Sequence, residues 1–314
     1  MKTNFKPIIL LCAAALFPFA SCRHKELCRD HTHGVEVQVV FDWEHAPDAH
    51  PSSMRLYLFP EEESDVLLYE FANAEGGRIT VPAGVYKALC LNSDTESVLY
   101  RNIGLFASFE AYAPDGALEA DYRSAPRAEG AGDERMTKSP DRLWSARDEN
   151  VHIGLGEAHR VLTFFPEESV CRYRIRILHA DNLRYISSAG ICGSLSGMSG
   201  GLLVGPNRTT AEPVTVPFHM TVRDSTTLET EFLCFGHCSA ERQTKHKVIV
   251  YAILDDGGKH YYTYDVTSLV HEAQDCRNVT IELDGLPLPT PITDGSGFRP
   301  SVDVWDEINE NISM

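Results

Sequence analysis

The segment from Cys234 to Cys238 (CFGHC) carries residue types that bind transition metals, because thiolate and imidazole are ligands that zinc prefers. His219 and His246 lie nearby in the sequence. Three residues separate the two cysteines, however, and no second cysteine pair accompanies them. A core thiol at Cys234 with a turn thiol at Cys238, or a disulfide between them, explains the segment better. We therefore expect neither a bound metal nor a cofactor.

Residues 197–201 (GMSGG) match the G-x-S-x-G pattern of a nucleophile elbow, in which a serine sits on a tight turn between a strand and a helix. The residues that follow, 202–206 (LLVGP), cannot begin a helix. We interpret the match as a glycine- and serine-rich turn and do not expect Ser199 to be a nucleophile. The sequence also contains no phosphate-binding loop or dinucleotide fingerprint, and it predicts a protein that is not an enzyme.

The N-terminal residues have the pattern of an export signal. Lys2 and Lys6 precede an uninterrupted apolar stretch over 8–20, and Ser21 stands directly before Cys22. The apolar stretch is shorter than the roughly 20 residues of a helical membrane span. A small residue followed by cysteine resembles the lipobox of bacterial lipoproteins, whose cysteine is diacylated and becomes the first residue. We expect a signal peptide over 1–21 and a lipid on Cys22; an ordinary secreted protein is the alternative.

The residues after Cys22 are expected to lie outside the cytoplasm, held at the outer membrane and exposed at the cell surface. Residues 22–34 are polar and lack periodicity, which predicts a tether. The chain has 45 acidic and 28 basic residues, and its net charge of −17 excludes nucleic acid as a partner because the two polyanions repel each other.

Nine cysteines occur in the chain, and Cys12 and Cys22 belong to the N-terminal signal region. The remaining number is odd, so they cannot all form disulfides within one chain. Cys90, Cys171 and Cys234 lie within apolar alternation like small core residues, and we expect mostly buried thiols.

Short segments rich in Val, Leu, Tyr and Phe, separated by turn residues, predict strands through the first half of the chain. These segments are 35–43, 54–59, 66–71, 84–92 and 99–112. Residues 113–150 are rich in Ala, Gly, Pro and charge, which predicts a long loop or a domain boundary. We expect an N-terminal β-sandwich over 35–150.

The second half repeats this style and predicts a C-terminal β-sandwich over 151–290. Residues 171–180 (CRYRIRILHA) alternate apolar and arginine side chains, so this strand should have one solvated face. Further strands are expected at 160–166, 214–222, 228–236, 247–254, 259–266 and 278–283. One short helix is expected from Asp265 to Gln274. The predicted fold class is all-β, with two tandem antiparallel sandwiches.

The C-terminal segment, 291–314, follows a proline-rich link that should be stiff and extended. Val302, Val304 and Trp305 would be wasted in a disordered tail, so we expect this segment to dock on a surface. That surface is either its own domain or a neighbouring subunit, to which the tail adds an edge strand.

Several segments resemble a family of Bacteroidetes lipoproteins of unassigned function, which is similar to fimbrillin-like and fimbrial-anchor lipoproteins. They are the lipobox cysteine, 54–60 (MRLYLFP), 71–94, 139–144 (SPDRLW), 193–201 (GSLSGMSGG) and 264–270 (YDVTSLV). The resemblance implies two transthyretin-like or immunoglobulin-like sandwiches that work as an anchor or accessory subunit of surface fimbriae. It brings no active-site residues. Residues 224–226 (DST) also resemble the O-glycosylation acceptor of that phylum, with Ser225 as the modified residue.

Polymerising fimbrillins are similar in having an N-terminal strand that cleavage after an arginine releases. Here Arg23 and Arg29 lie in the tether, so we expect an uncleaved anchor or cap that joins other fimbrial subunits by strand addition. The first alternative is a glycan- or host-ligand-binding module, with Tyr122 and Trp144 as ligand contacts. A surface hydrolase is the least supported alternative.

Overall fold

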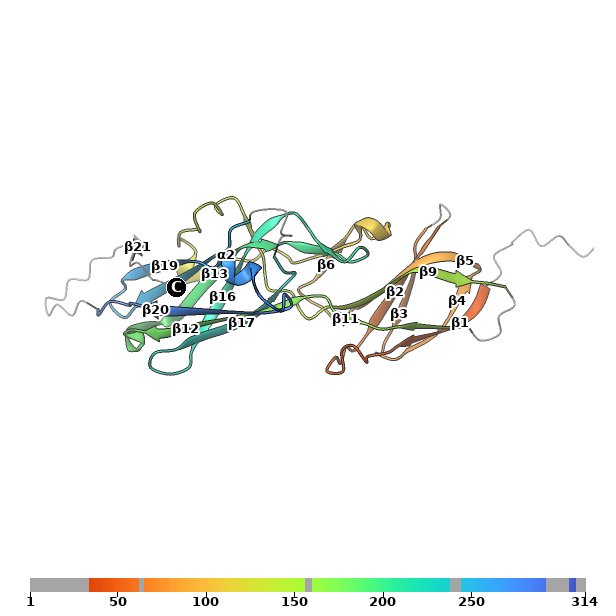
Figure 1. Ribbon diagram of the computed structural model, residues 1–314, viewed down its shortest axis with the longest axis horizontal. Coiled ribbons are helices and arrows are strands. Elements are labelled where there is room, and N and C mark those ends of the chain that lie inside the picture. Colours follow the sequence, from red (N-terminus) through yellow and green to blue (C-terminus); the bar gives the residue numbers. More distant parts are fainter. Residues whose placement is uncertain (1–33, 62–64, 156–159, 238–243, 292–304, 309–314) are drawn as a thin grey trace, which may run out of the picture.

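The protein is described here from a computed structural model, which covers residues 34–61, 65–155, 160–237, 244–291 and 305–308. Two β-rich lobes lie end to end in an elongated molecule (Figure 1). This confirms the predicted all-β fold class. None of the helices in these ranges has the length and apolar character needed to cross a membrane. The predicted signal peptide, Cys22, Val302 and Val304 lie outside the described residues.

The N-terminal lobe is a sandwich of two sheets. In the smaller sheet, β1 (Gly34–Phe41) pairs antiparallel with β4 (Gly76–Pro82) and parallel with β10 (Arg160–Phe164). The larger sheet has the order β11 (Glu167–Glu168), β9 (Trp144–Ile153), β5 (Gly84–Asn92), β2 (Met54–Pro60) and β3 (Leu67–Phe71). Alternate residues of β1 point into a core shared by both sheets, as expected for a strand with one buried face.

The boundary between the lobes differs from the predicted one at residue 150. Both β10 and β11 follow that position, yet they complete the N-terminal lobe. The predicted loop over 113–150 is also interrupted, because β9 begins at Trp144. Residues 146–153 of β9 (ARDENVHI) carry charged side chains on an exposed face. Because this composition is typical of a loop, the sequence did not predict the strand.

The C-terminal lobe is one nine-stranded sheet that folds over on itself. Its strand order is β20 (Asn278–Leu286), β12 (Cys171–Ala180), β17 (Leu228–Cys234), β16 (Pro213–Val222), β13 (Ile186–Ser199), β18 (Lys247–Leu254), β19 (Lys259–Asp265) and β21 (Asp306–Glu307), with β8 (Arg135–Met136) beside β16. The strand β16 pairs with β13 along most of its length and with β17 at its last two residues. It therefore forms the corner at which the chain passes from one layer to the other.

The strand β12 has the predicted bounds and the predicted solvated face. Tyr173, Ile175 and Ile177 are fully buried. The arginines on the opposite face pair with glutamates of neighbouring strands: Arg172 and Arg174 with Glu231, and Arg176 with Glu282. The arginine row is therefore a neutralised outer surface of the sheet.

The strand β13 is the longest in the molecule among the described residues, and the sequence did not predict it. Its glycines and serines have low strand propensity. The structure explains two of the glycines: Gly193 lies under the ring of Phe218, and Gly197 has a φ of +77° at the irregularity between Leu195 and Met198. Glycine in a strand interior marks a close backbone approach or a bulge, and β13 contains both.

The α-helix of this lobe, α2 (Thr267–His271), is shorter than the predicted helix over 265–274. Asp265 ends β19, and its Oδ1 accepts hydrogen bonds from the backbone N–H and the hydroxyl of Thr267. The predicted capping aspartate therefore lies just before a single helical turn.

A small fourth sheet and an apolar cluster join the two lobes. The sheet consists of β6 (Leu99–Arg101), β7 (Glu110–Tyr112), β14 (Gly201–Leu203) and β15 (Arg208–Thr209). The buried cluster takes Tyr57 and Leu89 from the N-terminal lobe and Leu202 and Phe235 from the C-terminal lobe, with Phe109 among them. The lobes consequently share a core instead of meeting at a flexible linker.

We expect Gly193→Ala to lower the free energy of unfolding by about 1–3 kcal/mol, because overpacking a closed core forces neighbouring groups to move. The new Cβ would clash with the Phe218 ring and lie 2.8 Å from the carbonyl oxygen of Ile249. Urea unfolding measures the loss. Gly104→Ala is the matched control, since no atom lies within 4 Å of its Cβ position. Equal stability of the two variants would contradict the packing argument.

Candidate functional site

The C-terminal segment returns to the outer edge of the C-terminal lobe. Its strand β21 pairs parallel with β19 through two residue pairs, His260 with Asp306 and Tyr261 with Glu307. The two lie side by side at the far end of that lobe (Figure 1). Part of the predicted docking tail therefore packs on its own chain in this structure.

Ile308 of this segment packs against the main apolar core of the C-terminal lobe, and Trp305 packs against a second buried cluster. Its ring centroid lies 5.9 Å from that of Tyr122 and 5.7 Å from that of Tyr251. Its Nε1 donates a hydrogen bond of 3.4 Å to the hydroxyl of Ser124, and the ammonium of Lys259 lies over the ring. The half-buried indole of Trp305 therefore packs against two buried tyrosines and a lysine ammonium.

The two predicted ligand-contact rings lie in different parts of the molecule. Tyr122 is fully buried, and its hydroxyl donates to the carbonyl oxygen of Gly190 at 2.6 Å. Trp144 is 7% exposed, with Trp43 at one edge and the Arg142 guanidinium over its ring. Neither ring presents a face to a ligand in solution, so their positions do not support a common binding surface.

Ser225 is exposed in the turn between β16 and β17. Next to it, Asp224 accepts a hydrogen bond from the backbone N–H of Thr226, and this bond lowers the pKa of the Asp224 carboxyl. The predicted acceptor hydroxyl is therefore accessible to a modifying enzyme.

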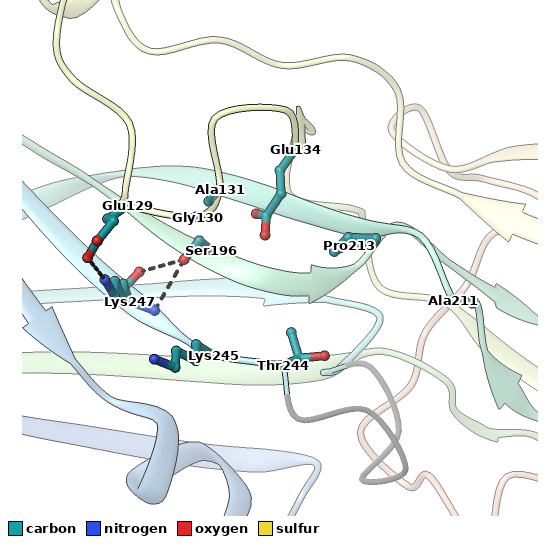
Figure 2. A pocket seen from close by; sticks show the side chains of 10 residues that line it. All are labelled: Glu129, Gly130, Ala131, Glu134, Ser196, Ala211, Pro213, Thr244, Lys245 and Lys247. Atoms are coloured by element: carbon teal, nitrogen blue, oxygen red, sulfur yellow. Dashed lines mark hydrogen bonds and ion pairs between the residues drawn. The ribbon is translucent and has the colours of Figure 1, made fainter.

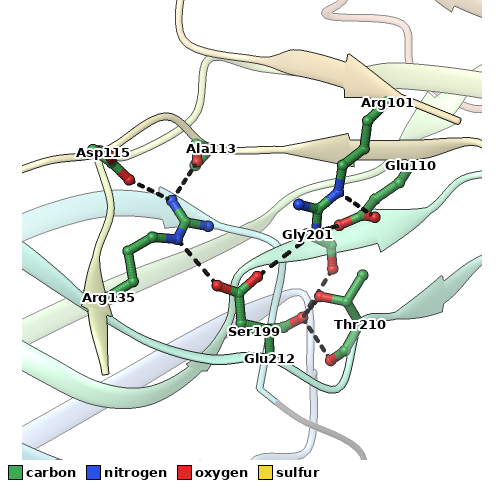
Figure 3. A network of polar contacts seen from close by, with 9 residues as sticks. All are labelled: Arg101, Glu110, Ala113, Asp115, Arg135, Ser199, Gly201, Thr210 and Glu212. Atoms are coloured by element: carbon green, nitrogen blue, oxygen red, sulfur yellow. Dashed lines mark hydrogen bonds and ion pairs between the residues drawn. The ribbon is translucent and has the colours of Figure 1, made fainter. Parts of the chain in front are cut away.

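Ser199 is a buried structural residue. It is 2% exposed, and its hydroxyl lies 2.8 Å from the carbonyl oxygen of Gly201 and 3.1 Å from that of Thr210 (Figure 3). The strand β14 follows it. The predicted absence of the helix that a nucleophile elbow needs is confirmed.

A chain of ion pairs surrounds Ser199 (Figure 3). Arg101 donates two hydrogen bonds of 2.7 Å to the buried carboxylate of Glu110. Glu212 lies between Arg101 and Arg135, and Arg135 continues to Asp115. The two pairs with Glu212 join the segment over 99–136 to the loop that leads into β16 and hold it against the C-terminal lobe, whereas the other two pairs lie within the segment.

A cavity of about 390 Å³ lies on the same lobe (Figure 2). Glu129 forms an ion pair of 3.0 Å with Lys247 at its rim. Glu134 accepts hydrogen bonds from the backbone N–H of Gly197 and from the hydroxyl of Thr215. The acidic side chains of the cavity are thus engaged with the protein itself.

The residues considered above as a metal site around Cys234 do not come together: Cys234, His219 and His246 have different neighbours. The thiol of Cys234 is buried, accepts a hydrogen bond from the N–H of Gly236, and has a pKa raised by that burial. Cys238 lies outside the described residues. The five cysteines that the structure describes as free include four buried or half-buried thiols, as predicted, and the exposed Cys276.

A cluster of imidazoles does form there, from His237, His246 and His271. The Nε2 atoms of His246 and His271 lie 3.0 Å apart, and the ring of His237 packs against both. Nδ1 of His246 donates to the carbonyl oxygen of Ser196 at 3.2 Å. Burial lowers the pKa of His246 to about 4, so this imidazole is neutral at neutral pH.

We expect the folded protein to lose stability as the pH falls from about 6.5 to 4. The unfolded chain protonates His246 near the ordinary value of 6.5, whereas the folded chain does so only near 4, so acid favours unfolding. The contribution is on the order of 2–3 kcal/mol. Urea unfolding of the wild type and of His246→Asn at pH 7 and pH 4.5 measures it.

The asparagine amide can keep the hydrogen bond to Ser196 but does not titrate, so the pH dependence should shrink in this variant. His152→Asn, on an exposed position of β9, should keep the wild-type dependence. An unchanged pH dependence in His246→Asn would show that other groups cause it.

The fold places the chain among all-β proteins in which two lobes share a core. The chain belongs to the family described as a domain of unknown function, DUF5119, whose model matches residues 21–219. The predicted family resemblance is confirmed.

The chain is also similar to a Bacteroides ovatus protein named as a candidate fimbrium anchoring subunit, Fim4B. The two are 24% identical over 306 residues, which cover 92% of this chain and 86% of that protein. A crystal structure of a candidate adhesin from Bacteroides ovatus has a TM-score of 0.61 at 22% identity and covers 83% of this chain and 96% of the other. A candidate adhesin from Bacteroides thetaiotaomicron has a TM-score of 0.51 at 12% identity, covering 82% and 92%. These structural similarities show the fold.

Proposed function

We propose that the protein is an anchor or accessory subunit of surface fimbriae and has a structural role. The observation that carries the proposal is the similarity to the candidate anchoring subunit, which extends over both lobes and 92% of the chain. The sequence similarity runs along nearly the whole of both chains, as expected for a structural subunit whose function depends on both lobes. The polar groups around Ser199 support a non-catalytic role, because they are engaged in holding the chain together.

An uncleaved anchor fits the position of β1 better than a repeating shaft subunit does. This strand is the middle one of its sheet, and it buries Val35, Val37, Val39 and Phe41. Releasing it would divide the sheet and open the core of the N-terminal lobe. Arg23 and Arg29 precede β1 in the sequence, so cleavage after either one leaves the strand in place and removes only the residues before it.

The lipid on Cys22 is the proposed attachment to the outer membrane, at the cell surface. Two acyl chains hold a protein on a bilayer stably, whereas one holds it only marginally. Eleven residues separate Cys22 from β1, so the N-terminal lobe would stay close to the membrane surface.

The proposed partner contact is the C-terminal segment with Val302, Val304 and Trp305, which another fimbrial subunit would take up by strand addition. Its strand pairing with β19 supports this role because the ladder is short: it has two residue pairs, and the Asp306 and Glu307 side chains are exposed. Trp305 adds ring contacts to Tyr122 and Tyr251, which a partner would have to replace. A partner groove that pairs with more of the segment would gain more main-chain hydrogen bonds than the segment loses at β19.

Changing Cys22→Ala should move the protein from the membrane fraction to the released fraction, because the acyl acceptor is lost. Fractionation with immunoblotting, together with mass spectrometry of the mature N-terminus, measures this. Cys28→Ala is the matched control and should stay with the membrane. A released fraction that is equally large in both variants would contradict lipid anchoring at Cys22.

Deleting residues 298–314 should weaken co-purification with fimbrial subunits by at least about tenfold while both lobes stay folded, because only Trp305 and Ile308 of the tail pack against their cores among the described residues. Trp305→Ala should give part of the loss. Leu269→Ala, at an exposed position of α2, is the control. Association that is unchanged or stronger after the deletion would show that the tail only covers the edge of β19.

A further inference from the structure

Three side chains that are far apart in the sequence converge on the outer face of the C-terminal lobe. Cys192 on β13 and His219 on β16 are directly opposite each other in the antiparallel ladder. Glu119 immediately precedes η3 (Ala120–Tyr122), in the segment that covers this face. The Cys192 Sγ lies 3.6 Å from Nδ1 of His219, and Oε1 of Glu119 lies 3.5 Å from the same nitrogen. All three donor atoms lie within 4.8 Å of one another.

We propose that Glu119, Cys192 and His219 bind a divalent transition-metal ion, for which zinc is the best chemical match. Zinc bonds are about 2.3 Å to sulfur, 2.0–2.1 Å to imidazole nitrogen and 2.0–2.2 Å to carboxylate oxygen. At a tetrahedral angle these lengths separate sulfur from nitrogen by about 3.6 Å and nitrogen from oxygen by about 3.4 Å. The observed separations agree with both values before any side chain moves.

The chemistry of the donor set also selects the ion. A thiolate and an imidazole favour a borderline-soft metal over magnesium or calcium, which take oxygen ligands. One thiol proton passes to solvent when the metal–sulfur bond forms, so the site adds one positive charge in a chain with a net charge of −17. That acidic surplus attracts cations to the protein.

A thiol catalyst is the other arrangement that cysteine, histidine and glutamate can form, and the geometry argues against it. A relay needs the thiol on one ring nitrogen and the carboxylate on the other. Here both Cys192 and Glu119 face Nδ1 of His219, so the carboxylate cannot orient the ring for proton transfer from the thiol. A metal site requires instead that all three donor atoms can reach one ion, and their mutual separations of no more than 4.8 Å allow this.

The surroundings leave a fourth position open. Cys192 is 2% exposed, whereas the side chains of His219 and Glu119 are about half exposed, at 50% and 59%. A metal would therefore sit between the sheet and solvent, with room for a water or a partner's side chain. Gly190 keeps this space: a Cβ there would lie 2.8 Å from Cε1 of His219.

Metal binding would link the segment that contains Glu119 to β13 and β16. Glu119 lies three residues before Tyr122, whose hydroxyl bonds to Gly190 and whose ring packs on Trp305. The ion would thus cross-link β13, β16 and the segment that receives the C-terminal tail.

Calorimetric titration of the full chain, stripped of metal and reduced, tests the proposal with zinc as the probe. We expect one equivalent to bind at this site, with Cys192→Ser and His219→Ala each weakening the affinity by at least about tenfold. Cobalt(II) should show a thiolate-to-metal charge-transfer band that Cys192→Ser removes. Because the His219 side chain is half exposed, we expect His219→Ala to fold, so that weaker zinc binding by this variant reports the loss of the ligand.

Two matched controls separate this site from other donors. Cys276→Ser removes an exposed cysteine, and His271→Ala removes a member of the separate imidazole cluster. Both should keep the affinity within about twofold and keep the cobalt band. Wild-type affinity in Cys192→Ser and His219→Ala, or loss of binding in His271→Ala alone, would overturn the proposal.

Discussion

The apolar cluster between the lobes is the interaction on which the rest of the structure depends. Phe109 lies among side chains from both lobes and is fully buried, with the ring of Tyr57 4.9 Å away. Full burial of one such side chain contributes about 1.5–3 kcal/mol, so this cluster outweighs any single polar contact at the junction. It makes both faces of β2 and β5 buried, one against β1 and the other against the second lobe. The two sandwiches therefore behave as one body.

The covering segment over 99–143 depends on that cluster and adds directional contacts to it. Phe109 fixes its middle, the ion pairs of Arg101 and Arg135 with Glu212 fix it to the loop before β16, and Tyr122 fixes its outer part to β13. These ion pairs are largely half exposed, and such a pair adds only about 0–1 kcal/mol of stability because water screens the attraction. The pairs therefore specify where the segment lies, while the apolar contacts provide the energy.

Local patterns predicted those parts of the fold that local patterns determine. The strand over 171–180 was predicted at its observed bounds because apolar residues that alternate with arginines are typical of a half-buried strand. The strand over 84–92, which is buried on both faces, was predicted at its observed bounds from its Val, Tyr and Leu residues between turn residues. The strand β13 was missed because its glycines reflect the Phe218 ring across the ladder, which a single sequence cannot show.

Sites assembled from distant segments were the least predictable. Glu119, Cys192 and His219 have no common spacing, and only the register of β13 on β16 brings two of them together. His219 was grouped with Cys234 because it is near in sequence, whereas the sheet turns the two residues toward different surroundings. Tyr122 and Trp144 were predicted as exposed rings, but their burial follows from packing between elements more than fifty residues apart.

The direction of β1 in its sheet bears on how the molecule responds to force. Gly34 pairs with Pro82, near the end of the lobe where Gly84 meets Ile153, and the chain runs from there toward the second lobe. The tail strand β21 lies at the opposite end of the molecule (Figure 1). Tension between an attachment before Gly34 and a load at the tail would pull β1 along its own axis, between β4 and β10. Its ladder hydrogen bonds would then share the load in shear, instead of breaking one at a time as in a peeled edge strand.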